Sequence, residues 1–441
     1  MQSLKNKKIG IVGLGITGTS IYSDITHYTN SIICWDDSEK NRHLFENQGI
    51  LLDLSDKQWH SIDIVFISPG IPNNHKIFLL AKEHNLLISS DIELFLHHNP
   101  NSKIIAITGT NGKSTTTALI GHILNHSGYD FPVGGNIGKP ALSLPKNKPG
   151  YVLELSSFQL DLISFLNTTI SVLLNITPDH LDRHGTFDEY CKAKMRILCG
   201  DGIKIIGVDA KTCKEIYDEL VGSGEKNIIA ISTNEKNNTI SCTKHSINDN
   251  FYDNCSHKLP ELQKLTGKHN QENIAASYAV CRSLGLKPSD IIEKLASFEG
   301  LKHRMQYLGS KNNVTYYNDS KATNANAAAC SLSSMQNIFW LAGGIFKEKN
   351  LDALENYWPN IKKAYLFGKS SLLFSEYLKD KVDFEVFSTM QEAFYKANIE
   401  AKSREEQANI ILAPACASFD QFNNFEERGN KFIDLCNEEL R

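Results

Sequence analysis

The sequence lacks the cysteine pattern of a protein that is stabilised by metal ions or disulfide bonds. Its 441 residues include ten cysteines but no Cys-x-x-Cys pair, so neither a zinc site nor a disulfide framework is indicated. Cys281, Cys330 and Cys416 stand among small or apolar neighbours, which predicts plain core thiols. Unpaired thiols are typical of a reducing compartment, so we expect a cytoplasmic protein.

The sequence also lacks a membrane segment and a basic surface. No run of about 18 apolar residues could span a bilayer. The N-terminal lysines precede an apolar stretch, as in a secretory leader, but the glycines of IGIVGLGITG interrupt it and argue against one. The net charge is −4 and no basic run exists, which argues against nucleic-acid binding. A chain of this length predicts two to four domains, with neither a membrane nor a nucleic acid as partner.

The strongest motif is KIIAITGTNGKSTTTALI, residues 103–120. An apolar strand, a glycine turn and a helix start follow one another, and this order brings loop amides and a helix N-terminus to phosphate oxygens. Lys113 would reach the β- and γ-phosphates, and the Ser114 hydroxyl would bind Mg²⁺. Ile107 stands where the general G-x-x-x-x-G-K-[ST] pattern has its first glycine. The motif predicts a nucleoside triphosphate site, and the alternative is an ordinary strand-to-helix turn.

A second glycine motif lies at the N-terminus. Residues 8–18 predict a strand followed by G-x-G-x-x-G, and a second strand, 31–35, ends at Asp36. This is the dinucleotide fingerprint, with an acid placed to hold a ribose hydroxyl. The motif does not say which nucleotide is bound, so NAD stays open. The loop SPGIP, residues 68–72, is either a ligand loop at the carboxyl edge of the sheet or a proline-fixed turn.

Polar residues follow two predicted strands of the central segment. Glu154 lies near the end of strand 151–155, where an acid beside a phosphate loop could hold Mg²⁺. Strand 170–174 leads into NITPDHLDRH, residues 175–184, in which two acids and two histidines favour a metal or catalytic role. The helix predicted over 187–198 carries three basic residues, and the pattern alone does not separate Lys194 from a solvated basic face.

The remaining segments predict further α/β structure. Residues 134–138, GGNIG, predict a turn-rich loop, and 231–258 an elaborated surface loop or short strands. Asn270 and Asn273 lie at the start of an Ala-rich helix, where they could cap the helix or bind a ligand. Beyond residue 301, four predicted strands with polar or glycine loops at their carboxyl ends form another open sheet: 314–318, 338–342, 364–367 and 409–413.

The whole therefore predicts an α/β protein of three domains. A Rossmann-like domain covers 1–98, a P-loop mononucleotide-binding domain covers 99–300, and a second Rossmann-like domain covers 301–441. The polar stretch HHNPNSK, at 97–103, is the candidate linker between the first two.

Taken together, the motifs resemble the Mur ligase family, ATP-dependent amide ligases of peptidoglycan precursor synthesis. They span nearly the whole chain. The segments that carry the resemblance are GLGITG (13–18), SPGIP (68–72), TGTNGKST (108–115), GGNIG (134–138), ELSSFQL (154–160), NITPDHLDRH (175–184), the helix with Lys194, GKHNQEN (267–273), HR (303–304), NDSKATN (318–324) and APACASFDQF (413–422).

The resemblance implies the ligands of each domain. In this family the first domain holds the UDP part of a sugar nucleotide, so NAD becomes a minor alternative. The implied UDP-substrate residues are Gly15, Ile16, Thr17, Asp36, Gly70 and Asn136. The implied ATP residues are Gly109, Thr110, Asn111, Gly112, Lys113, Ser114, Thr115, Asn270, Asn273, Arg304 and Asp319.

The resemblance also implies the chemistry. Two Mg²⁺ ions are expected on Ser114, Glu154, His180 and Lys194, with Lys194 as a carbamate. The implied catalytic residues are Lys113, Glu154, Asp179, His180 and Lys194. Within the family the chain is similar to the members that join D-glutamate to UDP-N-acetylmuramoyl-L-alanine. The implied D-glutamate residues are Lys321, Thr323, Lys347, Ser418 and Phe425, and a monomer is expected.

Other readings account for less of the sequence. Sister ligases that add diamino acids typically carry an Asn-Pro-Arg signature, which this sequence lacks. Folylpolyglutamate-type ligases do not need the first sheet. An NAD-dependent oxidoreductase leaves GKST, Glu154 and His180 without a role, and a non-catalytic nucleotide-binding module does not need the acid–histidine cluster. One loop departs from the family pattern: GGIFKEKN, around Lys347, lacks the Asp and second Gly that many relatives carry there.

Overall fold

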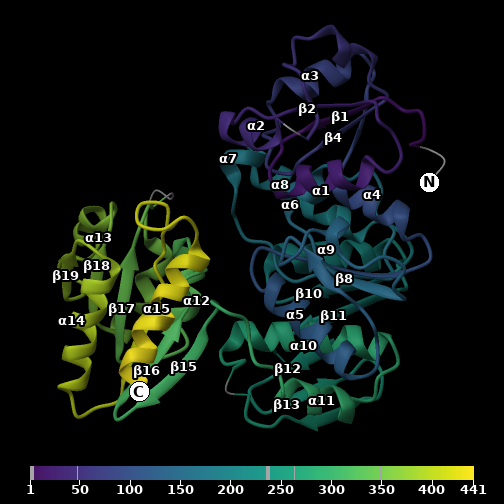
Figure 1. Ribbon diagram of the computed structural model, residues 1–441. Helices are drawn as coiled ribbons and strands as arrows, with labels where there is room; N and C mark the ends of the chain where they lie inside the picture. Colours follow the sequence, from purple (N-terminus) through teal and green to yellow (C-terminus); the bar gives the residue numbers. More distant parts are fainter. Residues whose placement is uncertain (1–3, 47, 235–238, 263, 347–349) are drawn as a thin grey trace. The chain divides into compact units, whose positions relative to one another are not determined.

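The chain divides into two compact units in a computed structural model (Figure 1). The first comprises residues 1–260 and 272–296, and the second comprises 261–271 and 297–441. The structure describes residues 4–46, 48–234, 239–262, 264–346 and 350–441.

The first unit begins with a five-stranded parallel sheet in the order β3-β2-β1-β4-β5. Its central strands are short apolar runs, and β1 is buried along its whole length. Its elements are β1 (Ile9–Val12), α1 (Ile16–Ile25), β2 (Ile32–Trp35), α2 (Glu39–Phe45), β3 (Ile50–Leu51), β4 (Ile64–Ile67), α3 (Lys76–Glu83), β5 (Leu87–Ser89) and α4 (Asp91–His98). Because α4 runs to His98, the candidate linker at 97–103 begins inside a helix.

A nine-stranded sheet forms the rest of the first unit, in the order β14-β13-β12-β11-β10-β9-β6-β8-β7. The strands from β12 to β7 run parallel, while β13 and β14 add an antiparallel extension at one edge. The strands are β6 (Lys103–Thr108), β7 (Val133–Gly135), β8 (Gly150–Glu154), β9 (Ile170–Leu173), β10 (Ile203–Gly207), β11 (Ile228–Ser232), β12 (Thr239–Cys242), β13 (Ser246–Asp249) and β14 (Cys255–Lys258).

Helices connect these strands. They are α5 (Lys113–His126), α6 (Ser157–Asp161), α7 (Leu181–His184), α8 (Phe187–Met195), α9 (Lys211–Gly222), α10 (Lys268–Ser283) and α11 (Pro288–Ala296). Two sequence predictions need correction here. The GGNIG segment begins inside β7 rather than in a loop, and β12 within 231–258 is fully buried rather than on the surface.

The second unit holds a six-stranded sheet in the order β15-β16-β20-β17-β18-β19, in which β15 alone of these strands runs antiparallel to its neighbour. Its elements are β15 (Gln306–Lys311), β16 (Val314–Asn318), α12 (Ala325–Leu332), β17 (Ile338–Gly343), β18 (Ile361–Phe367), α13 (Ser371–Leu378), β19 (Phe384–Phe387), α14 (Met390–Lys402), β20 (Ala408–Leu412) and α15 (Phe425–Leu440). The four predicted strands are present, and β15 and β19 extend the sheet beyond them.

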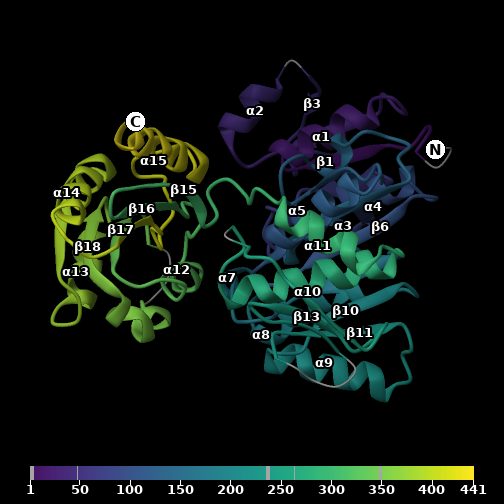
Figure 2. The same ribbon diagram turned by 90° about the horizontal axis from the view of Figure 1, so that it is seen from below.

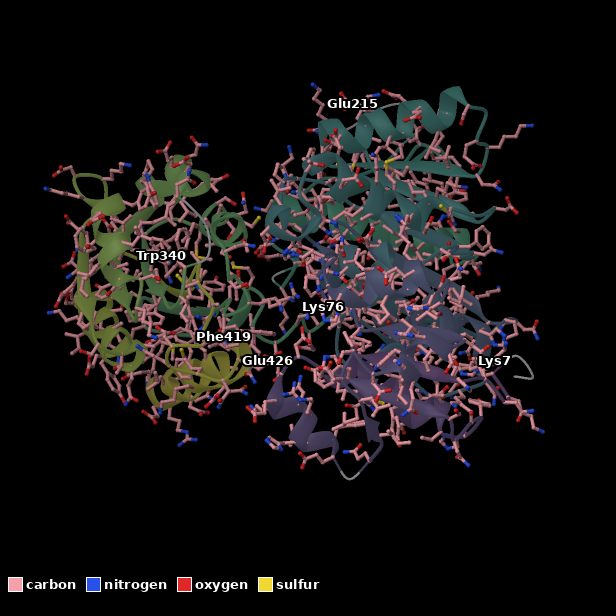
Figure 3. All side chains as sticks on the ribbon, turned by 90° about the horizontal axis from the view of Figure 1, so that it is seen from above. Lys7, Lys76, Glu215, Trp340, Phe419 and Glu426 are labelled. Atoms are coloured by element: carbon pink, nitrogen blue, oxygen red, sulfur yellow. The ribbon has the colours of Figure 1, made fainter. Side chains whose placement is uncertain are left out.

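Helices cover both faces of this last sheet. Figure 2 shows α14 and α15 on one face and α12 and α13 on the other, and each face has its own apolar core. Trp340 of β17, which is labelled in Figure 3, belongs to the buried core on the α12–α13 side, and its indole N–H donates to the Ala413 carbonyl at 2.7 Å.

The α/β fold class predicted from the sequence is confirmed. One sheet lies within each of the three predicted domain ranges. The boundaries at residues 98 and 300 stay a prediction. No helix of the described part of the chain is long and apolar enough to cross a membrane.

Candidate active site

The phosphate loop connects β6 to α5, and glycines permit its shape. Gly112 takes the left-handed conformation, with φ of 82°, directly before the first residue of α5. A Cβ atom there would lie 2.3 Å from Oδ1 of Asn273, so only glycine fits. Lys113 folds back over the loop, and its ammonium donates to the carbonyl oxygens of Gly109 and Thr110 at 2.8 Å each. Thr115 lies half-buried in the first turn of α5.

The loop after β9 is hydrogen-bonded to the phosphate loop. The Thr110 N–H donates to the Asn175 carbonyl at 2.7 Å, and the Asn111 N–H donates to Asn175 Oδ1 at 2.9 Å. The Thr110 hydroxyl bonds to the Thr177 carbonyl and lies 3.0 Å from the Tyr190 hydroxyl. Neither Asn175 nor Tyr190 was among the residues predicted from the sequence.

Glu154, at the end of β8, faces the start of α5. Its side chain is 2% exposed, and Oε2 accepts the Ser114 hydroxyl at 2.5 Å. Its other oxygen, Oε1, accepts from the Asn136 side-chain amide at 2.7 Å. A hydroxyl and a carboxylate are the oxygen ligands that Mg²⁺ takes in nucleotide sites, so this pair fits the predicted ion. Asn136, predicted to contact the UDP substrate, thereby lies against a predicted metal ligand.

The structure separates Lys194 from its basic neighbours. Lys194 is 1% exposed and donates to the Gly109 carbonyl at 2.8 Å, whereas Lys192 points outward and pairs with Glu189 at 2.7 Å. Burial lowers the pKa of Lys194 well below its usual value, and the positive charge of Lys113 lowers it further. A solvated basic face, the alternative left open by the sequence, does not describe this position.

The acids and histidines of NITPDHLDRH do not form one cluster. Asp179 lies against His180: Oδ1 accepts the His180 N–H at 2.9 Å, and Oδ2 lies 3.6 Å from Nε2. His184 instead packs inward, 3.1 Å from the Ser157 hydroxyl, and Asp182 is exposed. Among the described residues no three His, Cys, Asp or Glu side chains gather to hold a metal ion. The four side chains therefore do not meet at one place, because the short helix α7 turns His184 into the core, and the metal or catalytic role of Asp179 and His180 stays a prediction.

The first sheet presents an open edge around its glycine loop. A cavity of about 670 Å³ is lined by Gly15, Ile16 and other residues of α1 and α2, and Ile16 is 80% exposed. Thr17 is half-buried at the start of α1. Gly70 lies in open space, where even a Cβ atom would meet nothing within 4 Å.

Asp36 fixes this glycine loop rather than projecting from it. Its carboxylate accepts the Leu14 N–H at 2.5 Å, the Ser38 N–H at 2.7 Å and the Asn41 side-chain amide at 3.1 Å. The SPGIP loop is also held by a hydrogen bond, which the Arg183 guanidinium donates to the Pro69 carbonyl at 3.2 Å.

In the second unit, predicted ligand residues follow β16 and β20. The Lys321 ammonium lies over the Phe425 ring at 4.0 Å, so these two predicted D-glutamate residues meet. Thr323 lies half-buried in the same loop, and Ser418 is buried. Lys347 lies outside the described residues.

The predicted nucleotide residues of this unit lie beside that loop. Asp319 is buried and accepts the Ser331 hydroxyl, and burial raises the pKa of its carboxyl group. Arg304 lies half-buried near the start of β15. Asn270 donates to the Thr266 carbonyl at 2.8 Å, while Asn273, which belongs to the first unit, accepts from Thr116 at 3.0 Å. Because α10 already begins at Lys268, neither asparagine is its N-cap, and the capping alternative is wrong.

Sequence reasoning missed Arg428, which is fully buried in α15. Its guanidinium donates to the Ser320 carbonyl at 2.8 Å, to the Ser320 hydroxyl at 3.0 Å and to the Cys416 carbonyl at 3.0 Å. Ser320 in turn donates to the Phe425 carbonyl at 2.8 Å. Arg428 thus ties together the loops that carry Lys321 and Ser418. A signal existed, because Arg428 falls on the apolar stripe of α15 with Phe432 and Leu435.

Comparison with known proteins agrees with this arrangement. The sequence profile of the Mur ligase middle domain matches residues 107–281. A UDP-N-acetylmuramoylalanine–D-glutamate ligase of Rickettsia bellii is 47% identical, and the match covers 98% of each chain. A ligase of the same name from Rhizobium meliloti is 41% identical over 98% of this chain and 96% of its own.

Solved structures agree on the fold. A MurF ligase from Thermotoga maritima in complex with ADP matches with a TM-score of 0.61 at 17% identity, over all of this chain and 96% of its own. The UDP-N-acetylmuramate–alanine ligase of the same organism matches with a TM-score of 0.60 at 17% identity, over 98% of this chain and all of its own. With relatives that match it from end to end and a family profile that matches its centre, this chain belongs to the Mur ligase family.

Proposed function

We propose that the chain joins D-glutamate to UDP-N-acetylmuramoyl-L-alanine, with ATP converted to ADP and phosphate. One observation of the structure supports this most directly: Glu154 joins the phosphate loop, through Ser114, to the GGNIG loop, through Asn136. This chain of bonds brings a phosphate-binding loop and a predicted sugar-nucleotide residue to one carboxylate. The curated relatives named for this reaction match the whole chain, which supports the same substrates.

The reaction needs a leaving group, because a carboxylate does not form an amide at neutral pH. The carboxylate of the L-alanyl residue attacks the γ-phosphorus of ATP, the bond from γ-phosphorus to the bridging oxygen breaks, and ADP leaves. Lys113 and the loop amides would neutralise charge on the γ-phosphate during this transfer. The amine of D-glutamate then attacks the acyl phosphate, loses a proton and displaces phosphate, which leaves the amide.

Two Mg²⁺ ions would support this transfer. Ser114 and Glu154 would hold one, and Glu154, His180 and Lys194 would hold the other. Magnesium bound there would shield the phosphate oxygens from the incoming carboxylate. As an amine, Lys194 donates to the Gly109 carbonyl and offers no ligand oxygen. Its carbamate, formed by CO₂ with loss of a proton, would supply carboxylate oxygens, and Asp179 would orient His180.

The other predicted residues complete three binding regions. The first sheet would hold the UDP group with Gly15, Ile16, Thr17, Asp36 and Gly70, beside the cavity at α1. The second unit would hold D-glutamate with Lys321, Thr323, Ser418 and Phe425, and Arg304 and Asp319 would contact the nucleotide. We propose domains at 1–98, 99–300 and 301–441, acting as a cytoplasmic monomer.

Phosphate release from ATP tests the proposal. The protein is supplied with Mg²⁺ and UDP-N-acetylmuramoyl-L-alanine, and with D-glutamate, L-glutamate, glycine, L-lysine or diaminopimelate in separate reactions. We expect release only with D-glutamate. Release that depends on another of these amino acids would move the chain to a sister activity, and no release with any of them, together with tight NAD binding, would overturn the ligase assignment.

A further inference from the structure

Glu272 begins a chain of hydrogen bonds that ends in the phosphate loop. Its Oε2 accepts from the Asn175 side-chain amide at 2.7 Å. The oxygen of the same Asn175 side chain accepts the Asn111 N–H at 2.9 Å, and its Nδ2 also lies 3.3 Å from the Asn111 carbonyl oxygen. An asparagine side chain has one oxygen and one NH₂ group. Both ends of the Asn175 side chain thus contact Asn111, and the acceptor at Glu272 favours the orientation in which the oxygen of Asn175, not its NH₂ group, meets the Asn111 N–H.

We propose that Glu272 is a positioning residue for ATP, which acts through Asn175 to hold residues 110 and 111 of the phosphate loop. The inference rests on the proposed function in that the loop binds ATP. Asn175 binds this part of the loop with its main chain as well as its side chain, since its carbonyl oxygen accepts the Thr110 N–H at 2.7 Å. If the side-chain amide of Asn175 were turned over, its NH₂ group would face the Asn111 N–H, which is also a donor, and the loop would lose this hydrogen bond.

The surroundings of Glu272 hold it in place. Glu272 is the fifth residue of α10 and lies half-buried against the end of β10, where a Cβ atom on Gly207 would come 2.6 Å from Glu272 Oε1. Burial raises the pKa of Glu272 to about 7, and Asp209 adds to the rise. The next residue, Asn273, accepts from the Thr116 hydroxyl of α5, the helix that follows the loop. Neighbouring residues of α10 thus bond to the loop after β9 and to α5, the two segments that adjoin the phosphate loop.

The test measures ATP binding in variants that remove or keep the acceptor. Glu272→Met fills the space without an acceptor, Glu272→Ala removes the side chain, and Glu272→Gln keeps an oxygen without a charge. We expect the Kd and KM for ATP to rise about tenfold in the Met and Ala variants, as expected for about 1.4 kcal/mol. The Gln variant should stay within about threefold of the unaltered protein, while kcat and the KM for D-glutamate change less than about twofold in all three.

A double-variant cycle tests whether the effect passes through Asn175. In an Asn175→Ala background, Glu272→Met should raise the Kd for ATP no further. The matched control is Glu215→Met on α9, whose side chain is 63% exposed and is labelled in Figure 3; its Kd for ATP should not change.

Two outcomes would overturn the inference. One is an unchanged Kd for ATP in both acceptor-free variants, and the other is a full additional loss in the Asn175→Ala background. Failure of the proposed function looks different, because the unaltered protein would then release no phosphate with D-glutamate. If one acceptor-free variant does not fold, the other still gives the measurement.

Discussion

Two cationic side chains, Lys113 in the first unit and Arg428 in the second, both donate to main-chain carbonyls, but their surroundings differ. Lys113 donates to two carbonyls of its own loop at the open end of a sheet. Arg428 is fully buried and donates to oxygens of two other loops. Burial lowers the pKa of Arg428 to about 10, so the guanidinium stays charged at neutral pH.

The difference separates a cation that is available to a substrate from a cation that stabilises the fold. The carbonyls that accept from Lys113 are neighbours in sequence, so a phosphate can replace them without disturbing the fold. The carbonyls that accept from Arg428 belong to two separate loops, at Ser320 and Cys416, so removal of this side chain breaks a bridge between those loops. Removal of Lys113 should therefore affect turnover, and removal of Arg428 should affect stability.

The largest expected effect follows from Lys113→Met. Without its charge on the γ-phosphate, kcat should fall by about 10³-fold or more, because electrostatic stabilisation of a transferring phosphoryl group is lost. The melting temperature should stay unchanged. The measurements are phosphate release at saturating substrates and differential scanning calorimetry.

Lys192→Met is the control for this variant, because Lys192 is exposed and, among the ion pairs of the described residues, pairs only with Glu189. Its kcat should equal that of the unaltered protein. A Lys113→Met protein that loses stability but keeps its turnover would reverse the comparison.

Arg428→Met should give the next largest effect. It leaves the Ser320 and Cys416 carbonyls buried without this donor, so we expect the unfolding free energy of the second unit to fall by about 3 kcal/mol. Since these loops carry Lys321 and Ser418, the KM for D-glutamate should also rise about tenfold. Thermal unfolding and the KM for D-glutamate are the two measurements.

Two variants sharpen this result. Arg428→Lys keeps the charge but not the planar fork, so it should recover only part of the stability. Arg441→Met removes an exposed arginine of the same unit and should change neither quantity. If Arg428→Met were as stable as the unaltered protein, the loops would not depend on this side chain.

The sequence predicted the parts of the molecule that depend on local pattern. Apolar runs and glycine turns located β6, the phosphate loop and β16, because their spacing is set by short-range geometry. The roles suggested for individual residues came from the family resemblance. Pattern alone could not separate Lys194 from Lys192, because burial depends on what packs against α8.

Contacts between distant segments could not be predicted in the same way. Arg428 reaches Ser320, 108 residues away in sequence, and Glu272 reaches Asn175, 97 residues away. The two histidines of NITPDHLDRH looked equivalent, yet the turn at α7 leaves His180 half exposed and buries His184. Such outcomes depend on tertiary packing, which one sequence does not specify residue by residue.

Asp91, in the first unit, allows a further test of a buried ionisable group, with a smaller expected effect. Unlike Arg428, it is buried with one oxygen, Oδ1, that has no hydrogen-bond partner in the part of the chain that the structure describes. Burial raises the pKa of Asp91 to about 6, against the opposing effect of hydrogen bonds from Gln159 and from backbone amides. The folded protein then binds this proton more tightly than the unfolded chain does. The contribution of Asp91 to the stability of the folded protein is therefore most favourable below about pH 4 and is lost as the pH rises through 6.

Asp91→Asn removes this titration and should stabilise the protein at pH 7.5, by roughly 3 kcal/mol at most. The gain should shrink as the pH is lowered from 7 toward 4, because the unaltered carboxyl group also becomes neutral in the folded state. Thermal unfolding across this pH range measures it, with the exposed Asp201→Asn as a control that should show no gain. A gain that stayed constant with pH would mean that packing, rather than the buried charge, sets the difference. The comparison of Asp91, a buried charge with too few hydrogen-bond partners, with the hydrogen-bonded Arg428 would then no longer hold.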